Sequence, residues 1–438
     1  MSSQSFSSIT CPLILLRQVK IASSDSAELS APCDVLIEDG VITKIEASIE
    51  APAQAQIYEG GGEKILLPAL FDAHVHFREP GGDHKETLAT GVQSAINGGI
   101  TGVVCMPNTT PAIDSVATVK QLLDKASEVS PIEVYTSVCV TRGRAGKEIT
   151  DIGALHANGI VMLTDDGDTV EDISVLYQAM QYGAPMDMLF ASHCETNELA
   201  GDRAMNLGAL SYKLGVAGTP PCSEEIALNR DIALAHATGA RIHIQHLTTK
   251  IGMDLVAFWK ERGAKVTAEV SPHHLLFTAD DIADYDTHYK MNPPLRTLED
   301  NAALLQGLID GTIDMLATDH APHSPFEKSL DFVAAPNGII GLDTALISLY
   351  DALISKGKLS WQRLVQAYCD MPRTLMNLDV AKVEVGATAN IVLFDPNVET
   401  LVDRNFIKSK SENTPYLNKT LQGNVEQVFY NNLSLKND

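Results

Sequence analysis

The sequence predicts an α/β fold: a (β/α)8 TIM-type barrel with a small β-sandwich domain built from both ends of the chain. From Pro68 onward, eight short apolar segments alternate with stretches of helical length, as in successive βα units. Short β-like runs precede this region and return after about residue 385. The 438 residues leave room for a barrel, which needs roughly 250, and a smaller domain.

The first 67 residues contain short apolar runs that are typical of strands. Turn residues such as Asp39-Gly40 separate them. The strand-like runs are 13–21, 35–37, 41–45, 57–58 and 65–67, and similar runs recur at 389–394, 400–402 and 427–430. We therefore expect residues 1–67 and 385–438 to form one composite β domain.

Residues 68–384 are expected to form the barrel. The predicted strands are 70–77, 102–107, 132–140, 159–163, 186–193, 241–246, 265–271 and 314–318. The predicted helices are 87–97, 115–128, 170–182, 223–238, 252–262 and 298–309. Ser223 is expected to cap its helix, and Glu224 and Glu225 favour the positive end of the helix dipole. In such barrels the chemistry lies at the carboxyl ends of the strands.

The composition excludes several classes of partner. A formal net charge of −24 disfavours binding to nucleic acid or to an anionic membrane. The seven scattered cysteines include no Cys-x-x-Cys pair, which predicts free thiols in a reducing cytoplasm and no thiolate metal site. No apolar run approaches the roughly 20 residues of a membrane span. We expect a cytoplasmic protein that acts on a small molecule.

Two histidines, His74 and His76, end the first predicted barrel strand. Because side chains alternate along a strand, both imidazoles point to the same side, where they can begin a metal site. Arg78 shares that side and can bind an anion beside the metal. A His-x-His pair alone is a weak signal, so the prediction depends on further ligands elsewhere in the chain.

Other predicted strand ends carry further polar side chains. A single histidine or aspartate there is more often a turn or capping residue, but five strand ends that each offer a ligand argue for a common site. Besides the first strand, the five include the fourth with Asp165 and Asp166, the fifth with His193, the sixth with His246, and the eighth with Asp319, His320 and His323. Further polar residues at strand ends are Asn108 after the second strand and His273 and His274 after the seventh. We expect a structural role for His273 and His274, leave that of His320 open, and interpret His243 as an ordinary surface, helix or core histidine.

The order of these residues resembles the amidohydrolase superfamily, and class I dihydroorotases most closely. Asp72-x-His74-x-His76-x-Arg78-x-Pro80 resembles the first motif of that family, and residues 317–323 followed by Lys328 resemble the second. Further similar segments are 106–109, 291–296 and Asn413-Thr414-Pro415, which resembles the closing β segment of the family. The resemblance extends from about residue 12 to residue 432.

This resemblance implies a set of site residues. The implied metal ligands are His74, His76, His193, His246 and Asp319, with Asp166 in place of the carboxylated lysine that often bridges metals in the superfamily. Imidazoles and carboxylates suit Zn²⁺, as one or two ions, and zinc makes bound water a nucleophile at neutral pH. Asp319 is the implied general base and then acid. Arg78, Asn108 and His323 are implied to hold a substrate carboxylate, and Asn292 the substrate ring.

The implied activity is a zinc-dependent, reversible cyclisation of N-carbamoyl-L-aspartate to L-dihydroorotate in pyrimidine biosynthesis. Two alternatives stay open: another cyclic amidase of the hydantoinase or allantoinase type, and a non-catalytic homologue that scaffolds aspartate transcarbamoylase. The family also implies a homodimer or a complex with aspartate transcarbamoylase. Two departures are Asn337, where the family often has an aromatic residue, and Pro68-Ala69 in place of Pro-Gly. We expect the first to alter the substrate loop and the second only the packing.

Overall fold

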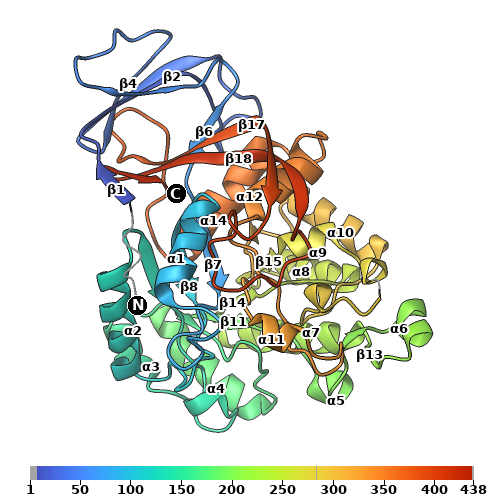
Figure 1. Cartoon of the computed structure of the whole chain (residues 1–438). Helices are drawn as coiled ribbons and strands as arrows, with labels where there is room; N and C mark the ends of the chain where they lie inside the picture. The colour runs from blue at the N-terminus through green and yellow to red at the C-terminus, as the bar shows by residue number, and fades with distance from the viewer. Residues whose placement is uncertain (1–6, 283, 437–438) are drawn as a thin grey trace.

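The structure is a computed structural model that describes residues 7–282 and 284–436. A sheet built from the blue N-terminal and red C-terminal strands lies above a barrel with surrounding helices (Figure 1). No helix in these two ranges combines the length and the apolar character needed to cross a bilayer.

Eight parallel strands form the barrel. Two hydrogen-bonded sheets contain them, β7-β8-β9 and β10-β11-β14-β15-β16. Their bounds are β7 Leu70–Val75, β8 Ile100–Cys105, β9 Glu133–Thr136, β10 Met162–Leu163, β11 Leu189–Ser192, β14 Arg241–Ile244, β15 Val266–Val270 and β16 Met315–Leu316. Parallel bridges from Val138 to Leu163 and from Val75 to His320 join the two sheets at both edges. The ring is therefore closed, which confirms the predicted barrel.

Helices follow most of the strands. The longer ones are α1 Leu88–Asn97, α2 Val116–Val129, α3 Ile152–Ala157, α4 Ile173–Gly183, α6 Ala209–Leu214, α7 Cys222–Thr238, α8 Lys250–Glu261 and α10 Leu298–Asp310. Short helices are α5 Asn197–Ala200, α9 Pro272–Leu276, α11 Pro325–Lys328, α12 Ala345–Leu349, α13 Trp361–Val365 and α14 Met371–Leu375, and a small parallel pair joins β12 Met205–Asn206 to β13 Gly218–Thr219. Thr87 and Ser115 cap α1 and α2 with reciprocal side-chain bonds, which explains where these helices begin.

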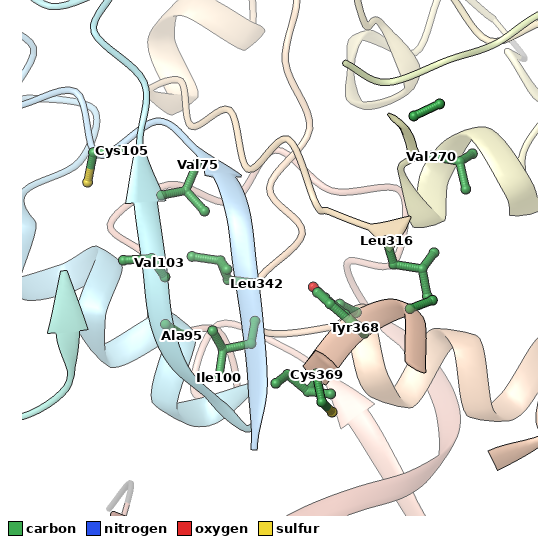
Figure 2. Close-up of a cluster of buried hydrophobic side chains, with 14 of the residues drawn as sticks. Val75, Ala95, Ile100, Val103, Cys105, Val270, Leu316, Leu342, Tyr368 and Cys369 are labelled. Carbon is green, nitrogen blue, oxygen red and sulfur yellow. The ribbon is translucent and has the colours of Figure 1, made fainter. Parts of the chain in front are cut away.

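Buried apolar side chains pack the strands against the helices. Figure 2 shows Val75 and Val103 from neighbouring strands on one side of this cluster, and Leu316 and Tyr368 on the other. All four are at most 1% exposed. The Tyr368 hydroxyl donates to Asp72 Oδ2 at 2.8 Å, which ties the π-helical segment Gln366–Asp370 after α13 to the first barrel strand. Asp72 lies two residues before His74, so this packing supports the strand that carries the histidine pair.

Both ends of the chain meet in one nine-stranded sheet. Its order is β1-β19-β18-β17-β6-β2-β3-β4, with β5 paired to β2. The bounds are β1 Ser7–Thr10, β2 Leu13–Ile21, β3 Cys33–Glu38, β4 Val41–Glu46, β5 Gln56–Glu59, β6 Ile65–Pro68, β17 Asn390–Val402, β18 Lys419–Tyr430 and β19 Leu433–Lys436. Strand β6 pairs with β17 and leads almost directly into β7. The sheet is thus attached to the barrel strand that carries the histidine pair.

Some local predictions were wrong. Ser223 does not cap its helix, because α7 begins at Cys222 after Pro221. The Ser223 hydroxyl instead bonds the backbone of Thr196. Several barrel strands are shorter than predicted; of the predicted strand 159–163, only Met162–Leu163 is a strand. In the β domain, the two predicted strands 389–394 and 400–402 belong to the single strand β17. Residues 413–415 form no strand, and β18 begins at Lys419.

Candidate metal and anion-binding site

The carboxyl end of the barrel gathers a buried group of histidines and aspartates. Three overlapping clusters have ligand atoms that lie within 4.8 Å of one another. They are His74 with His76 and Asp166, His74 with His246 and Asp319, and Asp166 with His193 and His246. The structure therefore brings together all six residues that were expected to bind metal.

Two carboxylates face the histidine pair of strand β7. His74 Nε2 lies 3.3 Å from Asp166 Oδ1 and 3.4 Å from Asp319 Oδ1, and His76 Nε2 lies 2.9 Å from Asp319 Oδ1. The Nε2 atom of His74 and the Nδ1 atom of His246 are buried and have no hydrogen-bond partner among the described residues. Buried polar atoms without partners are costly, and a cation between His74 Nε2 and the two aspartates would satisfy that nitrogen. The donor set fits a metal that prefers nitrogen and oxygen ligands.

Unusual backbone conformations direct two of these side chains inward. His246 follows β14 with φ +32°, and Asp319 follows β16 with φ +47°. Residues other than glycine rarely adopt positive φ, and such positions are enriched at functional sites. His246 Nε2 consequently lies 2.8 Å from His193 Nδ1 at the end of β11. The fifth, sixth and eighth strands thus deliver their side chains to one place.

Both aspartates are ionised in this environment. Burial would raise the pKa of Asp319, but the neighbouring His74 and His76 outweigh it and lower the pKa to about 2. Burial acts in the same sense on Asp166, and His74 again reverses it, so the pKa of Asp166 lies well below its usual value. Two carboxylates beside four imidazoles provide the negative charge that a divalent cation requires.

Glu269 forms hydrogen bonds with two of the histidines that were expected to bind metal. Its Oε1 atom lies 2.6 Å from His74 Nδ1 and accepts a bond from the His246 backbone N–H at 3.2 Å, and His243 Nε2 lies 3.0 Å from Oε2. A carboxylate only accepts, so His74 Nδ1 carries a proton and Nε2 is the nitrogen that faces the two aspartates. We did not anticipate Glu269 from the sequence. The available signal was a single acid inside the apolar run of β15.

Asn108 and Arg144 hold other parts of the site. Asn108 Oδ1 lies 2.9 Å from His76 Nδ1, and Asn108 Nδ2 donates to Asp166 Oδ2 at 3.2 Å. Arg144 donates to the Asp166 carbonyl at 2.8 Å and pairs with Asp168 at 2.7 Å. Asn108 therefore contacts the metal cluster directly in addition to facing the pocket. Arg144 lies after β9 and carried no signal in the sequence.

A cavity of about 400 Å³ opens onto the cluster. It is lined by five of the six expected metal ligands and by Arg78, Asn108, Met291, Asn292, Ala321, His323, Pro336 and Asn337, together with Gly167. All four residues expected to bind substrate therefore lie on its wall. The volume suits a small-molecule ligand.

Donor groups dominate one side of this cavity. Arg78 donates through Nε to the Pro322 carbonyl at 3.2 Å, and its Nη2 atom lies 3.5 Å from His323 Nε2. His323 Nε2 donates to the Asn337 carbonyl at 2.8 Å. Asn292 Nδ2 donates to Glu195 Oε2 at 3.3 Å. The grouping of a guanidinium and a ring N–H provides a place for an anion beside the acidic cluster.

Three other histidines at the strand ends lie outside the clusters. His274 Nε2 donates to the Pro293 carbonyl at 2.9 Å and so supports the segment that carries Asn292. His273 Nε2 has no hydrogen-bond partner within the described ranges. His320 Nε2 lies 3.3 Å from Glu86 Oε2, and Nδ1 accepts from the Gly341 N–H at 3.2 Å. His274 and His320 therefore bond to other parts of the chain, which is the pattern of residues with a structural role.

Comparisons with known proteins identify the family of the chain and, separately, solved structures with the same fold. The family described as Dihydro-orotase-like matches residues 63–252. A dihydroorotase of Acetivibrio thermocellus is 41% identical over 91% of this chain and 93% of its own, and one of Brevibacillus brevis is 43% identical over 90% and 92%. An L-hydantoinase from Arthrobacter aurescens superposes with a TM-score of 0.83 at 23% identity, covering 95% of this chain and 94% of its own. A D-hydantoinase from a Thermus species reaches 0.80 at 24% identity, covering 96% and 94%.

Proposed function

Because the chain belongs to the dihydroorotase family of amidohydrolases, we propose that its pocket is the active site of a dihydroorotase. Such an enzyme interconverts N-carbamoyl-L-aspartate and L-dihydroorotate by closing or opening a cyclic amide. The observation that carries the proposal is one cavity lined both by metal-binding groups and by the donors Arg78 and His323. A cyclic amide that bears a carboxylate needs both.

We propose that zinc, as one or two ions, binds at His74, His76, Asp166, His193, His246 and Asp319. Support comes from the nitrogen and oxygen donor set and from the buried His74 Nε2 atom, which has no hydrogen-bond partner among the described residues. When bound, zinc polarises the amide carbonyl and makes water nucleophilic near pH 7. The metal would therefore supply the nucleophile, and the chain must supply orientation and proton transfer.

Asp319 is the proposed proton carrier. It is ionised and lies on the cavity wall, with Oδ1 2.9 Å from His76 Nε2. In the direction of ring opening, Asp319 accepts a proton from the attacking water, then delivers it to the ring nitrogen that leaves. In the direction of ring closure the same carboxyl removes the proton from the carbamoyl nitrogen. One residue can serve both directions because the steps are the reverse of each other.

The opposite wall is proposed to bind the substrate carboxylate. Arg78 supplies a guanidinium, and Asn108 and His323 supply neutral donors. Asn292 lies near His193 and is proposed to contact the ring. Each charge-assisted bond to the carboxylate contributes about 1.5–3 kcal/mol. This wall therefore favours substrates that carry a carboxylate over neutral cyclic amides.

Hydantoinases are the principal alternative. The two solved hydantoinases share 23% and 24% identity with the chain. Similarity at this level shows a common fold but not a common substrate. The relatives with 41% and 43% identity are dihydroorotases. A non-catalytic scaffold is disfavoured because the described site retains all six metal-binding groups.

A comparison of substrates tests the proposal. The purified, zinc-loaded protein is assayed with L-dihydroorotate, N-carbamoyl-L-aspartate, hydantoin and allantoin, and its zinc content is measured. We expect turnover of the first two compounds and at least one zinc per chain. Faster turnover of hydantoin or allantoin would reverse the ranking, and an inactive protein without zinc would favour the scaffold.

Assembly and location stay predictions. We propose a homodimer or a complex with aspartate transcarbamoylase, and a cytoplasmic location, from the family resemblance and the seven free cysteines. Light scattering of the purified chain, alone and with aspartate transcarbamoylase, distinguishes these assemblies. A monomer that does not bind the transcarbamoylase would contradict both.

A further inference from the structure

The imidazole of His323 is contacted at both ring nitrogens by groups of opposite hydrogen-bonding character. Its Nε2 atom lies 2.8 Å from the carbonyl oxygen of Asn337, which can only accept. Its Nδ1 atom lies 3.2 Å from Nζ of Lys85, whose ammonium can only donate. Both contacts require the same tautomer, with the proton on Nε2 and the lone pair on Nδ1; Arg78 Nη2, a second donor near Nε2, is farther away at 3.5 Å.

Lys85 is itself held in place. Its Nζ atom forms an ion pair with Glu327 Oε1 at 2.9 Å, and only 21% of its side chain is exposed. Glu327 is oriented in turn by Ser324, whose N–H and hydroxyl both donate to Oε2, at 2.9 and 2.7 Å. The Lys85 carbonyl accepts from the Ser411 hydroxyl at 2.7 Å. These contacts distinguish Lys85 from a mobile surface lysine.

The charges around His323 keep its ring neutral. Burial, followed by the positive charges of Arg78, Lys85 and Lys328, lowers the pKa of His323 to about 2, although Glu327 opposes them. A neutral ring with its proton on Nε2 is a donor towards the cavity. The opposite tautomer would present a lone pair there and would repel an anionic oxygen.

We propose that Lys85 is a positioning residue of the substrate-carboxylate subsite. It holds His323 in the tautomer that donates from Nε2, and it adds a positive charge beside that of Arg78. In the structure the Asn337 carbonyl accepts the His323 bond, and the substrate carboxylate takes its place. This inference rests on the proposed function, but its central claim concerns the His323 proton and can be tested without turnover.

Kinetics of Lys85 variants provide the first test. Lys85→Met removes the donor and the charge at similar length, and Lys85→Arg retains both. For Lys85→Met we expect KM for L-dihydroorotate to rise about tenfold or more, with kcat within about twofold and unchanged zinc content. Lys85→Arg restores most of the wild-type KM. Lys120→Met is the matched control, since Lys120 is an exposed residue of α2 that pairs with Asp124.

Nitrogen-15 NMR of labelled histidines provides the second test, with the His323 signals identified by their loss in His323→Gln. We expect the wild-type and Lys85→Arg rings to carry the proton on Nε2 and the Lys85→Met ring to populate both tautomers. An unchanged KM in folded Lys85→Met, or a wild-type His323 protonated on Nδ1, overturns the inference. If the wild-type chain does not turn over dihydroorotate, the proposed function fails, and the NMR result still decides the role of Lys85. If Lys85→Met does not fold, a wild-type or Lys85→Arg His323 ring that is protonated on Nδ1 still overturns the inference.

Discussion

Glu269 contacts two of the proposed metal ligands, although it faces no solvent. It orients the His74 ring through Nδ1 and holds the His246 backbone, while His243 occupies its second oxygen. Carboxylates that accept from the distal N–H of a metal-bound imidazole fix the ring and increase its basicity. Glu269 therefore contributes to metal affinity without touching the metal.

Replacement of Glu269 by leucine should weaken zinc binding. Loss of the acceptor frees the His74 ring and its tautomer, so we expect the zinc dissociation constant to rise about 10–100-fold. Competition with a chromophoric chelator measures this constant. Glu269→Gln, which keeps an acceptor oxygen but no charge, should fall between leucine and wild type. Glu299→Gln is the control at an exposed residue paired with Lys250, and unchanged affinity in Glu269→Leu would contradict the argument.

Arg78 acts on the substrate side of the cavity, so its removal should leave the metal in place. We expect Arg78→Ala to raise KM for dihydroorotate about 10–150-fold, the equivalent of one lost charge-assisted bond, with unchanged zinc content. Steady-state kinetics and elemental analysis of the same preparation check both statements. Loss of zinc in this variant would show that Arg78 supports the cluster instead.

The proposed metal ligands could be named from the sequence because they lie at or just after predicted strands, in an order that resembles the family. The residues that orient the side chains of the site could not be predicted, because each is distant in the chain from the residue that it contacts. Glu269 lies 195 positions from His74, and Lys85 lies 238 positions from His323. A pattern in one segment carries no information about such pairings. Only the closed barrel brings those segments into contact.

At the scale of the element, two buried lysines hold the loop that lines the cavity. Lys290 Nζ donates to the carbonyls of Val333 and Ala335 at 2.8 and 2.6 Å, and Lys328 Nζ donates to those of Pro336 and Gly338 at 3.0 and 3.1 Å. Backbone carbonyls provide no countercharge. Burial, assisted by the charge of Lys290, therefore lowers the pKa of Lys328 to about 7.

This lowered pKa predicts a specific dependence of stability on pH. Above pH 7 the folded Lys328 loses its proton while the unfolded chain keeps it up to about pH 10.4, so stability rises with pH in this window. The neutral amine still donates to both carbonyls. We expect the free energy of unfolding of wild type, relative to Lys328→Met, to rise by about 1–2 kcal/mol from pH 7 to pH 9. Urea titrations measure it, with exposed Lys356→Met as control; parallel curves for wild type and Lys328→Met would contradict it.

Element boundaries were predictable where a side chain sets them. Thr87 and Ser115 mark the beginnings of α1 and α2 by capping bonds that the sequence pattern encodes. Ser223 was also expected to cap its helix, but its hydroxyl bonds to the backbone of Thr196. Tertiary contacts there outweighed the local preference, and the prediction was wrong.

At the scale of the whole molecule, the segment between β17 and β18 supports the part of the cavity wall that carries His323. Asn413 donates to the carbonyls of Ala321 and Gly338 at 3.0 and 2.9 Å and accepts from the His323 N–H at 3.0 Å. The Ser409 hydroxyl bonds to buried Glu86. The segment between β17 and β18 is thus bound to the segment after β7, which carries Arg78, and to the segment after β16, which carries His323.

Asn413→Ala should reduce both stability and substrate affinity. It leaves buried backbone groups without partners, which costs about 1–3 kcal/mol, and it frees the His323 backbone. We expect a lower urea midpoint and a higher KM, while zinc affinity stays at the wild-type value because the metal cluster lies outside these contacts. Asn405→Ala, in the same segment and bonded to Asp403, is the control. Weaker zinc binding in Asn413→Ala would show that the metal-binding and carboxylate-binding parts of the cavity are not independent.

The global arrangement was more predictable than its details. Alternating segments predicted the barrel, and β-like runs at both ends predicted that these ends would meet, as they do where β6 pairs with β17. No helix was predicted after β16, whereas the structure forms α11, α12, α13 and α14 there. Asn413 was expected in a closing β segment, and its side chain instead joins two loops.

The position of Asn413 in the chain has a consequence for biosynthesis. A ribosome adds residues in order, so every proposed metal ligand, the last being Asp319, is made well before Asn413. The segment that braces the proposed carboxylate pocket is therefore the last part of the site to leave the ribosome.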